Sequence, residues 1–343
     1  MLKYNQWIYG DTAPAIDVFQ DGPDYYGYDV SNYFGFDKRI HSAPLYAAPL
    51  PLFDKIIYEE SEENIIFRKE DDGKVVKVRK DGSSMPQFLE FPVKSMSDFK
   101  KIKKRFNPND QNRTPGNFKS KIEEYKKRDY VLNVGGTLFS GFFSVLRELM
   151  GFDTTLTKFY DDIKLIMEIL DFFTDYYINL YKKVVSQVEV DCIYIWEDMC
   201  YKNGPLISPE FFRKYILPYY KRFTSVMKDY GVKNFFVDTD GNPEKLIPLF
   251  IEGGVTGLFP FEINSGVNIE KIRVQYPELV IIGGIDKTAL SKGKDNIIKE
   301  INKAKRMVSI GGYIPHTDHA VPPDVSFENY KFFRKELIKI IKK

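Results

Sequence analysis

The sequence predicts a (β/α)8 TIM barrel, in which eight parallel strands alternate with helices. From about residue 130 onward, short apolar runs alternate with longer patterns of helical periodicity, and this alternation is typical of a parallel sheet. The apolar runs are continuous, as expected for strands that are buried on both faces. No GxGxxG motif follows a strand and no GxxxxGK[ST] motif occurs, which disfavours a dinucleotide-binding fold and excludes a P-loop. We therefore expect a single barrel domain over residues 1–343.

Six strand–helix units can be placed from the sequence. Strands are expected near residues 131, 192, 235, 256, 280 and 312. Apolar residues at helical spacing predict helices at 142–149, 161–188, 208–230, 243–251, 295–308 and 326–340. The first two units of the barrel would then lie in the less regular N-terminal third.

Residues 56–93 are predicted to form an antiparallel β-meander inserted into the barrel. Polar and apolar residues alternate around 65–68 and 75–78, and turn sequences at 71–73 and 81–82 separate the runs. Residues 1–55 are irregular and rich in tyrosine and proline. We expect this segment either to cover the barrel mouth and shape a substrate pocket or to serve as packing.

Composition narrows the class of protein. The chain has a formal net charge of +2, so it gives no electrostatic case for nucleic acid or an anionic membrane as a partner. Its two cysteines, Cys192 and Cys200, belong to no CxxC pattern, which argues against a disulfide framework and a structural zinc site. The N-terminus has no signal-peptide pattern, and the longest uncharged run, 130–146, contains polar residues and glycines. A cytoplasmic protein is expected.

Acidic side chains follow four of the predicted strands, and histidines follow the last one. They are Glu197 and Asp198, Asp238 and Asp240, Glu262, Asp286, and then His316, Asp318 and His319. In a parallel barrel the carboxyl ends of the strands meet at one mouth, so these groups should converge. Clustered carboxylates repel one another unless a cation joins them. Because carboxylate and imidazole both ligate zinc and related ions, the pattern suits a metal ion.

Structural roles compete with functional ones at several of these positions. Residues 240–243 suit a turn followed by a helix N-cap, because Asp and Asn accept from free helix N–H groups and Pro fits the first turn. The other structural alternatives are helix capping by Asp286, a salt bridge from Asp198 to Lys202 or Lys214, and packing of His316 beside Pro315.

Several motifs together resemble the uroporphyrinogen decarboxylase superfamily. They are WEDMCYKNGPLISPEFFRKYILPYYKRF at 196–223, FFVDTDGN at 235–242, EGGVTGLFPFE at 252–262, LVIIGGIDKTAL at 279–290 and GGYIPHTDHAVPPDVSFENYKFF at 311–333. The resemblance covers roughly the C-terminal two thirds of the chain. It implies a (β/α)8 barrel and one of two activities, decarboxylation of uroporphyrinogen or corrinoid-linked methyl transfer.

The methyltransferase branch is the better match. The decarboxylases carry an arginine-rich N-terminal motif that holds the substrate carboxylates, and the corresponding region here, 20–33, is acidic and aromatic. An acid-rich mouth would repel a substrate with eight carboxylates. In the methyltransferases, zinc is held by His-x-Cys after one strand and by Cys after the last. This chain has Asp238-Thr239-Asp240 and His319 at those places.

The resemblance therefore implies a methyltransferase of the O-demethylase kind, acting on a methylated small molecule such as a methoxyaromatic. The methyl group would pass to a corrinoid on a separate partner protein, because the chain has no DxHxxG-type corrinoid module. A homodimer is one expected assembly. The residues that this hypothesis assigns are Glu197, Asp198, Asp240, Asp286 and His319 for catalysis, Trp196, Tyr33 and Phe259 for substrate binding, and Asp238, Asp240, Glu262 and His319 for zinc. Two alternatives stay open, a decarboxylase-like lyase and a metal-free ligand-binding barrel.

Overall fold

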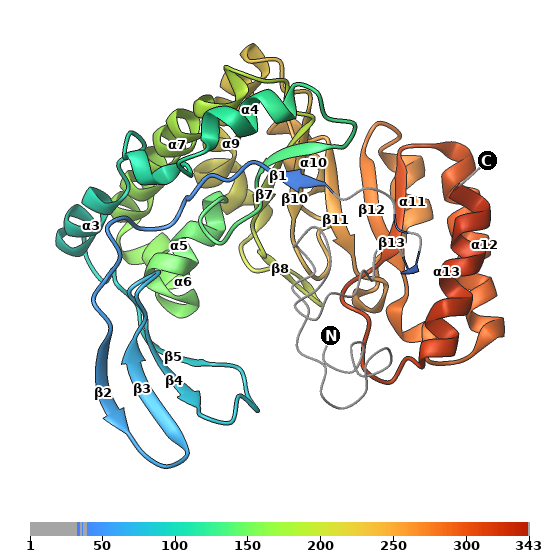
Figure 1. Cartoon of the computed structure of the whole chain (residues 1–343), viewed down its shortest axis with the longest axis horizontal. Helices are drawn as coiled ribbons and strands as arrows, with labels where there is room; N and C mark the ends of the chain where they lie inside the picture. Colours follow the sequence, from blue (N-terminus) through green and yellow to red (C-terminus); the bar gives the residue numbers. More distant parts are fainter. Residues whose placement is uncertain (1–32, 35, 37–39, 342–343) are drawn as a thin grey trace.

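A curled, all-parallel sheet forms the centre of the protein (Figure 1). The computed structural model describes residues 33, 34, 36 and 40–341. In this part of the chain, seven strands lie side by side in the order in which they occur in the sequence. They are β1 (His41–Ser42), β6 (Leu132–Gly135), β7 (Cys192–Trp196), β10 (Asn234–Asp238), β11 (Gly257–Phe261), β12 (Val280–Ile285) and β13 (Tyr313–Thr317).

This sheet confirms the predicted fold class. Every neighbouring pair of strands is parallel, and sequential order with a curled sheet is the arrangement of a (β/α)8 barrel. All six strands expected from residue 130 onward are present at the expected places. In the N-terminal third the described residues supply one strand of this parallel sheet, β1, where the sequence predicted two units. β1 and β13 are the two edges of the sheet as described.

Helices cover the outer face of the sheet. Those that follow the first strands are α4 (Phe118–Tyr125), α5 (Phe142–Met150), α6 (Phe152–Asp161), α7 (Ile163–Val185), α8 (Pro209–Phe211) and α9 (Leu217–Asp229). The later ones are α10 (Ile247–Glu252), α11 (Ile269–Gln275), α12 (Lys294–Ile310) and α13 (Phe327–Ile341). Short 3-10 turns lie at Lys103–Arg105, Gln111–Arg113, Ile263–Ser265 and Lys287–Leu290.

Several helices differ from the sequence prediction, two of them for local reasons that the structure shows. The helix predicted at 161–188 begins at Ile163, because the Asp162 side chain accepts a hydrogen bond from the N–H of Leu165 and caps α7. The helix predicted at 208–230 contains a π-helical turn, Phe212–Ile216, just before Pro218, which lacks the N–H that an α-helix needs. The helix predicted at 243–251 begins at Ile247, and the short helices α4, α6 and α11 were not predicted from the sequence.

The predicted meander is a four-stranded antiparallel sheet that projects from the body of the protein (Figure 1). Its strands are β2 (Ile56–Glu60), β3 (Asn64–Arg68), β4 (Val75–Arg79) and β5 (Gln87–Glu90), and α3 (Met96–Ile102) follows. A buried ion network ties it to α5, where the Lys74 ammonium contacts Glu148 and lies 3.3 Å from Asp72. Removing one member would leave buried charges unpaired, so this network fixes where the meander attaches.

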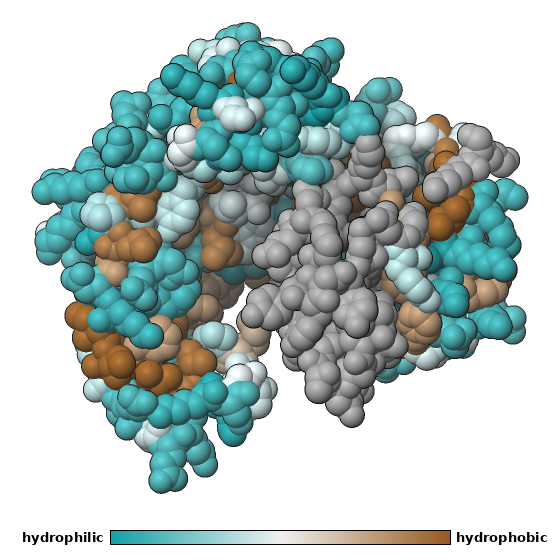
Figure 2. All heavy atoms as spheres, viewed as in Figure 1, coloured by the Kyte–Doolittle hydropathy of each residue, from teal (hydrophilic) through white to brown (hydrophobic). Residues whose placement is uncertain are grey.

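One face of the meander is apolar and only partly covered. Ile57, Phe67, Val76 and Phe88 pair in register across its four strands. Val76 in the middle is 1% exposed, whereas Ile57 and Phe88 at the edges are 52% and 49% exposed. Figure 2 shows hydrophobic surface over this part of the molecule. The meander therefore shields its centre and leaves its rim open.

The two cysteines and the helices bear on the class of protein. Cys192 and Cys200 are free and buried, and burial raises the pKa of each thiol to about 12. Within the described residues, no helix combines the length and the apolar character needed to span a membrane.

Candidate active site

The candidate site lies at the carboxyl ends of β7, β10, β11, β12 and β13. Asp238 is the last residue of β10 and pairs in register with Trp196 of β7 and Phe259 of β11. Side chains of paired residues in neighbouring strands point to the same face, here the inside of the curled sheet. The Tyr194 ring lies on this face as well, 5.2 Å from the Phe259 ring. Asp238 therefore sits among aromatic side chains, and two of them were predicted to bind substrate.

Burial changes the chemistry of Asp238. Burial, followed by the charges of Asp240 and Asp198, raises the pKa of Asp238 to about 7. None of the described residues donates a hydrogen bond to its carboxylate. This carboxyl group is therefore partly protonated at neutral pH and can donate or accept a proton toward the inside of the barrel.

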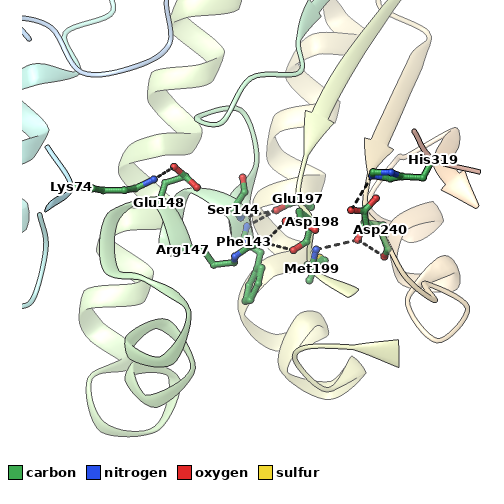
Figure 3. Close-up of polar contacts among 11 residues, drawn as sticks. Lys74, Phe143, Ser144, Arg147, Glu148, Glu197, Asp198, Met199, Asp240 and His319 are labelled. Carbon is green, nitrogen blue, oxygen red and sulfur yellow. Dashed lines mark hydrogen bonds and ion pairs between the residues drawn. The ribbon is translucent and has the colours of Figure 1, made fainter. Parts of the chain in front are cut away.

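Asp240 and His319 face each other across the mouth (Figure 3). Their nearest atoms, Oδ2 of Asp240 and Nε2 of His319, are 3.7 Å apart, and both side chains are more than 40% exposed. Burial raises the pKa of Asp240, and the charges of Asp198 and Glu262 add to this shift, although His319 opposes it. The pair can exchange a proton with a bound substrate and with solvent.

Glu262 is held by two partners. Its Oε2 accepts a hydrogen bond from the N–H of Gly241 at 2.8 Å, and its Oε1 lies 3.0 Å from the Lys287 ammonium. Burial by itself would raise the pKa of Glu262, but the Gly241 N–H and the Lys287 ammonium lower it below its usual value. Glu262 is thus an ionised partner of Lys287. Lys287 was not predicted as a site residue, because its pairing with Glu262 depends on how the loops after β11 and β12 turn.

Asp318 positions this ion pair. It is fully buried, and its carboxylate accepts from the N–H of Ile263, beside Glu262, and from the N–H of Lys287, each at 2.9 Å. One side chain from the end of β13 therefore holds the loops after β11 and β12 together. The sequence analysis placed Asp318 at a strand end but gave it no role.

Glu197 points away from this site, toward α5 (Figure 3). It is fully buried, and its carboxylate accepts from the N–H groups of Phe142, Phe143 and Ser144 and from the hydroxyl of Tyr220. These contacts cap the N-terminus of α5, whose own N-cap, Gly141, has no side chain. All the contacts of Glu197 are structural, so it acts by positioning.

Asp198 is fixed by Arg147, not by either lysine that the sequence suggested. The Arg147 guanidinium contacts the carbonyl oxygen of Asp198 and lies 3.0 Å from its carboxylate. Asp198 has a positive φ of 44°, an unusual conformation for a residue other than glycine, and these contacts hold it there. Its charge acts on Asp238 and Asp240, so it belongs to the electrostatics of the site.

Asp286 caps the 3-10 turn Lys287–Leu290, as its structural alternative proposed, whereas Asn242 caps a turn that precedes α10, which begins only at Ile247. Asp286 accepts hydrogen bonds from the N–H and the hydroxyl of Thr288 and from the side chain of Asn264. Burial alone would raise the pKa of Asp286, but these hydrogen bonds lower it below its usual value. Asn242 accepts from the N–H of Glu244. We leave Asp286 out of the proposed chemistry for this reason.

Tyr33 lies beside α13. Its ring is 4.9 Å from the ring of Phe34 and 6.0 Å from that of Phe327, the first residue of the helix, and it is 55% exposed. The rest of the predicted aromatic cover, 20–32, lies outside the described residues. Substrate binding by Tyr33 stays a prediction.

The predicted zinc ligands do not come together as a set. Over the described parts of the chain, no three His, Cys, Asp or Glu side chains form a group that could hold a metal ion. Zinc needs about four ligands at roughly 2.0–2.2 Å. Here Asp240 approaches His319 alone, while both oxygens of Glu262 are taken by Lys287 and Gly241. The donors present do not fit the metal.

Comparison with known protein families shows the family to which this chain belongs. Residues 73–339 match the family model of uroporphyrinogen decarboxylase (URO-D), which is more than half of the sequence. The chain belongs to the URO-D family. This result confirms the resemblance that the sequence motifs carried.

One relative supports the methyltransferase-like branch of the URO-D family, and one solved structure supports its fold. Methylcobamide:CoM methyltransferase MtbA of Methanosarcina acetivorans is 26% identical over 233 residues, which are 67% of this chain. The match covers 65% of that relative's length. A methyltransferase structure from Methanosarcina mazei covers 75% of this chain and 72% of its own, with 17% identity and a TM-score of 0.52. The structural likeness shows the fold.

Proposed function

We propose that this URO-D family protein is a corrinoid-linked methyltransferase that takes a methyl group from a methylated small molecule. The sequence similarity to a methylcobamide methyltransferase, 26% identity over 233 residues, supports the reaction class. The observation that carries the proposal within the site is Asp238, a carboxyl group with a pKa near 7 between Trp196 and Phe259. The aromatic side chains suit a flat donor such as a methoxyaromatic compound.

The proposed reaction transfers the methyl group of an ether to a reduced corrinoid on a partner protein. The corrinoid supplies the electron pair that forms the new bond to the methyl carbon. The carbon–oxygen bond breaks, its electron pair stays on the oxygen, and that oxygen takes up one proton to become a hydroxyl. The protein must therefore provide a proton at the ether oxygen.

Different residues of the site would donate the proton, orient the methyl donor and return the proton from solvent. The Asp238 carboxyl, protonated in part at neutral pH, donates the proton to the leaving oxygen. Trp196 and Phe259 orient the donor ring on the same face of the sheet. Asp240 and His319, more exposed and 3.7 Å apart, return a proton from solvent to Asp238 after each turnover.

The test uses free cob(I)alamin as the acceptor and a panel of methoxyaromatic donors. Formation of methylcobalamin is followed by its absorbance, and the demethylated phenol is identified by mass spectrometry. Asp238→Asn should slow the transfer by about 10²–10⁴-fold, the usual contribution of a positioned acid. Asp54→Asn, just before the meander and with a side chain that is 98% exposed, is the matched control and should match the wild type.

A second arm separates this proposal from a lyase on the same barrel. The protein is incubated with uroporphyrinogen, and carbon dioxide and coproporphyrinogen are measured, the latter after chemical oxidation to coproporphyrin. Decarboxylation without methylcobalamin formation from any donor would overturn the methyltransferase proposal. Methyl transfer that depends on Asp238 would support it.

A further inference from the structure

The loops after β11 and β12 place an ammonium group inside the predicted metal site. Lys287 Nζ lies 3.0 Å from Oε1 of Glu262, one of the four predicted ligands. The other oxygen of Glu262 accepts the N–H of Gly241, next to Asp240, a second predicted ligand. Lys287 thus contacts one predicted ligand, and its charge acts on a second, Asp240.

The position of Lys287 is built into the fold. Its backbone N–H donates to the fully buried carboxylate of Asp318, which also holds the N–H of Ile263 next to Glu262. The Lys287 and Glu262 side chains are each only 20% exposed. A mostly buried pair whose backbones share one anchoring carboxylate does not separate as readily as a surface salt bridge.

The Lys287 ammonium offsets the repulsion among the carboxylates at the mouth. Asp198, Asp238, Asp240 and Glu262 gather several carboxylates at one mouth, and such a group repels itself unless a cation is present. The charge of Lys287 acts on both Glu262 and Asp240. A metal ion placed at Glu262 would compete with the ammonium for the same oxygens and would meet its positive charge at close range.

We propose that Lys287 is the resident cation of this site, in the place where the related methyltransferases hold zinc, and that the protein works without a bound metal ion. The inference concerns the same site as the proposed function and deepens it. It is tested by zinc binding, so it can fail while methyl transfer is observed, and the reverse is equally true.

The experiment measures zinc in the full chain, purified without an affinity tag. Metal content is determined by elemental analysis, and zinc chloride is then titrated into the protein by calorimetry. The wild type should contain no stoichiometric zinc and show no saturable binding at micromolar zinc. Lys287→Ala frees Glu262 beside Asp240 and His319, and it should bind one zinc ion about tenfold or more tightly than the wild type.

Two further variants identify the cause of that gain. Lys287→Arg keeps the positive charge, so it should resemble the wild type. The double variant Lys287→Ala with Glu262→Gln removes the freed carboxylate, so it should lose the gain. Circular dichroism and thermal melting confirm that each variant is folded, and if Lys287→Ala does not fold, Lys287→Met keeps the apolar stem and takes its place.

Two results would overturn the proposal. One is close to one zinc ion per chain in the wild type, lost in Asp240→Ala, because the ammonium would then not have excluded the metal. The other is a folded Lys287→Ala or Lys287→Met variant that binds zinc no better than the wild type, because Lys287 would then not occupy the cation position.

Discussion

Glu197 and Asp238 are two carboxylates at the ends of neighbouring strands, yet they have opposite environments. Glu197 is fully buried and its carboxylate accepts four hydrogen bonds, three of them from the backbone of α5. Asp238 faces the aromatic interior of the barrel, and no described residue donates to it. The first carboxylate is committed to the fold, and the second is available for chemistry.

The alternation of side chains along a strand explains the difference. In β7 the fully buried Ile193 and Ile195 point to the helices, and Glu197 continues this series at steps of two residues. Trp196 lies between Ile195 and Glu197 in the sequence and points inward, in register with Asp238. An acid after a strand is therefore a site candidate only when it shares a face with the interior residues.

Replacing Glu197 by alanine should cause the largest loss of folding stability among these variants. Glu197→Ala would leave several buried donors at the start of α5 without an acceptor, each costing about 1–3 kcal/mol. Because water will enter and satisfy some of them, we expect a loss of about 3–5 kcal/mol in the free energy of unfolding. Chemical denaturation monitored by circular dichroism measures it.

Tyr220→Phe is the matched control for that variant. It removes only the hydroxyl that donates to Glu197 and keeps the ring in the core, so it should cost about 2 kcal/mol, as expected for one hydrogen bond to a charged group. If Glu197→Ala were no less stable than Tyr220→Phe, the backbone contacts of Glu197 would not contribute to stability.

Asp238 should instead make stability depend on pH. Its pKa is about 7 in the folded protein and 3.8 in a model peptide, so the folded state holds the proton more tightly. As pH rises from about 4 to 7, the unfolded state releases its proton first, and the folded state loses stability by at most about 1.4 kcal/mol per pH unit. Below this window both states are protonated and the dependence vanishes.

Asp238→Asn removes this titration. Its stability relative to the wild type should increase as pH rises through the window and then level off above pH 7. Thermal melts of both proteins at a series of pH values measure the difference. A constant difference across the whole series would show that Asp238 is an ordinary ionised carboxylate, and the proton that it donates in the proposed function would lose its basis.

The sequence predicts the frame better than it predicts the contacts. Strands from residue 130 onward were placed correctly because buried parallel strands have continuous apolar runs that turns and helices interrupt. Trp196, Asp238 and Phe259 come together because strand register is a consequence of that frame. Lys287 was missed because its pairing with Glu262 depends on how two loops turn, which no local pattern specifies.

Arg147→Met should have the smallest effect, and it tests the link between the two environments. Arg147 comes from α5, the helix that Glu197 caps, and its guanidinium holds Asp198, whose charge raises the pKa of Asp238. Because the pair is partly exposed, the loss of stability should be about 1 kcal/mol.

Removing the positive charge leaves the negative field of Asp198 and Asp240 at Asp238 less balanced. The midpoint of the pH dependence should therefore move upward, toward a higher pKa of Asp238, in the same series of thermal melts. Arg147→Lys keeps the charge and should keep the midpoint. An unchanged midpoint in Arg147→Met would mean that Arg147, and with it the helix capped by Glu197, has no electrostatic influence on Asp238.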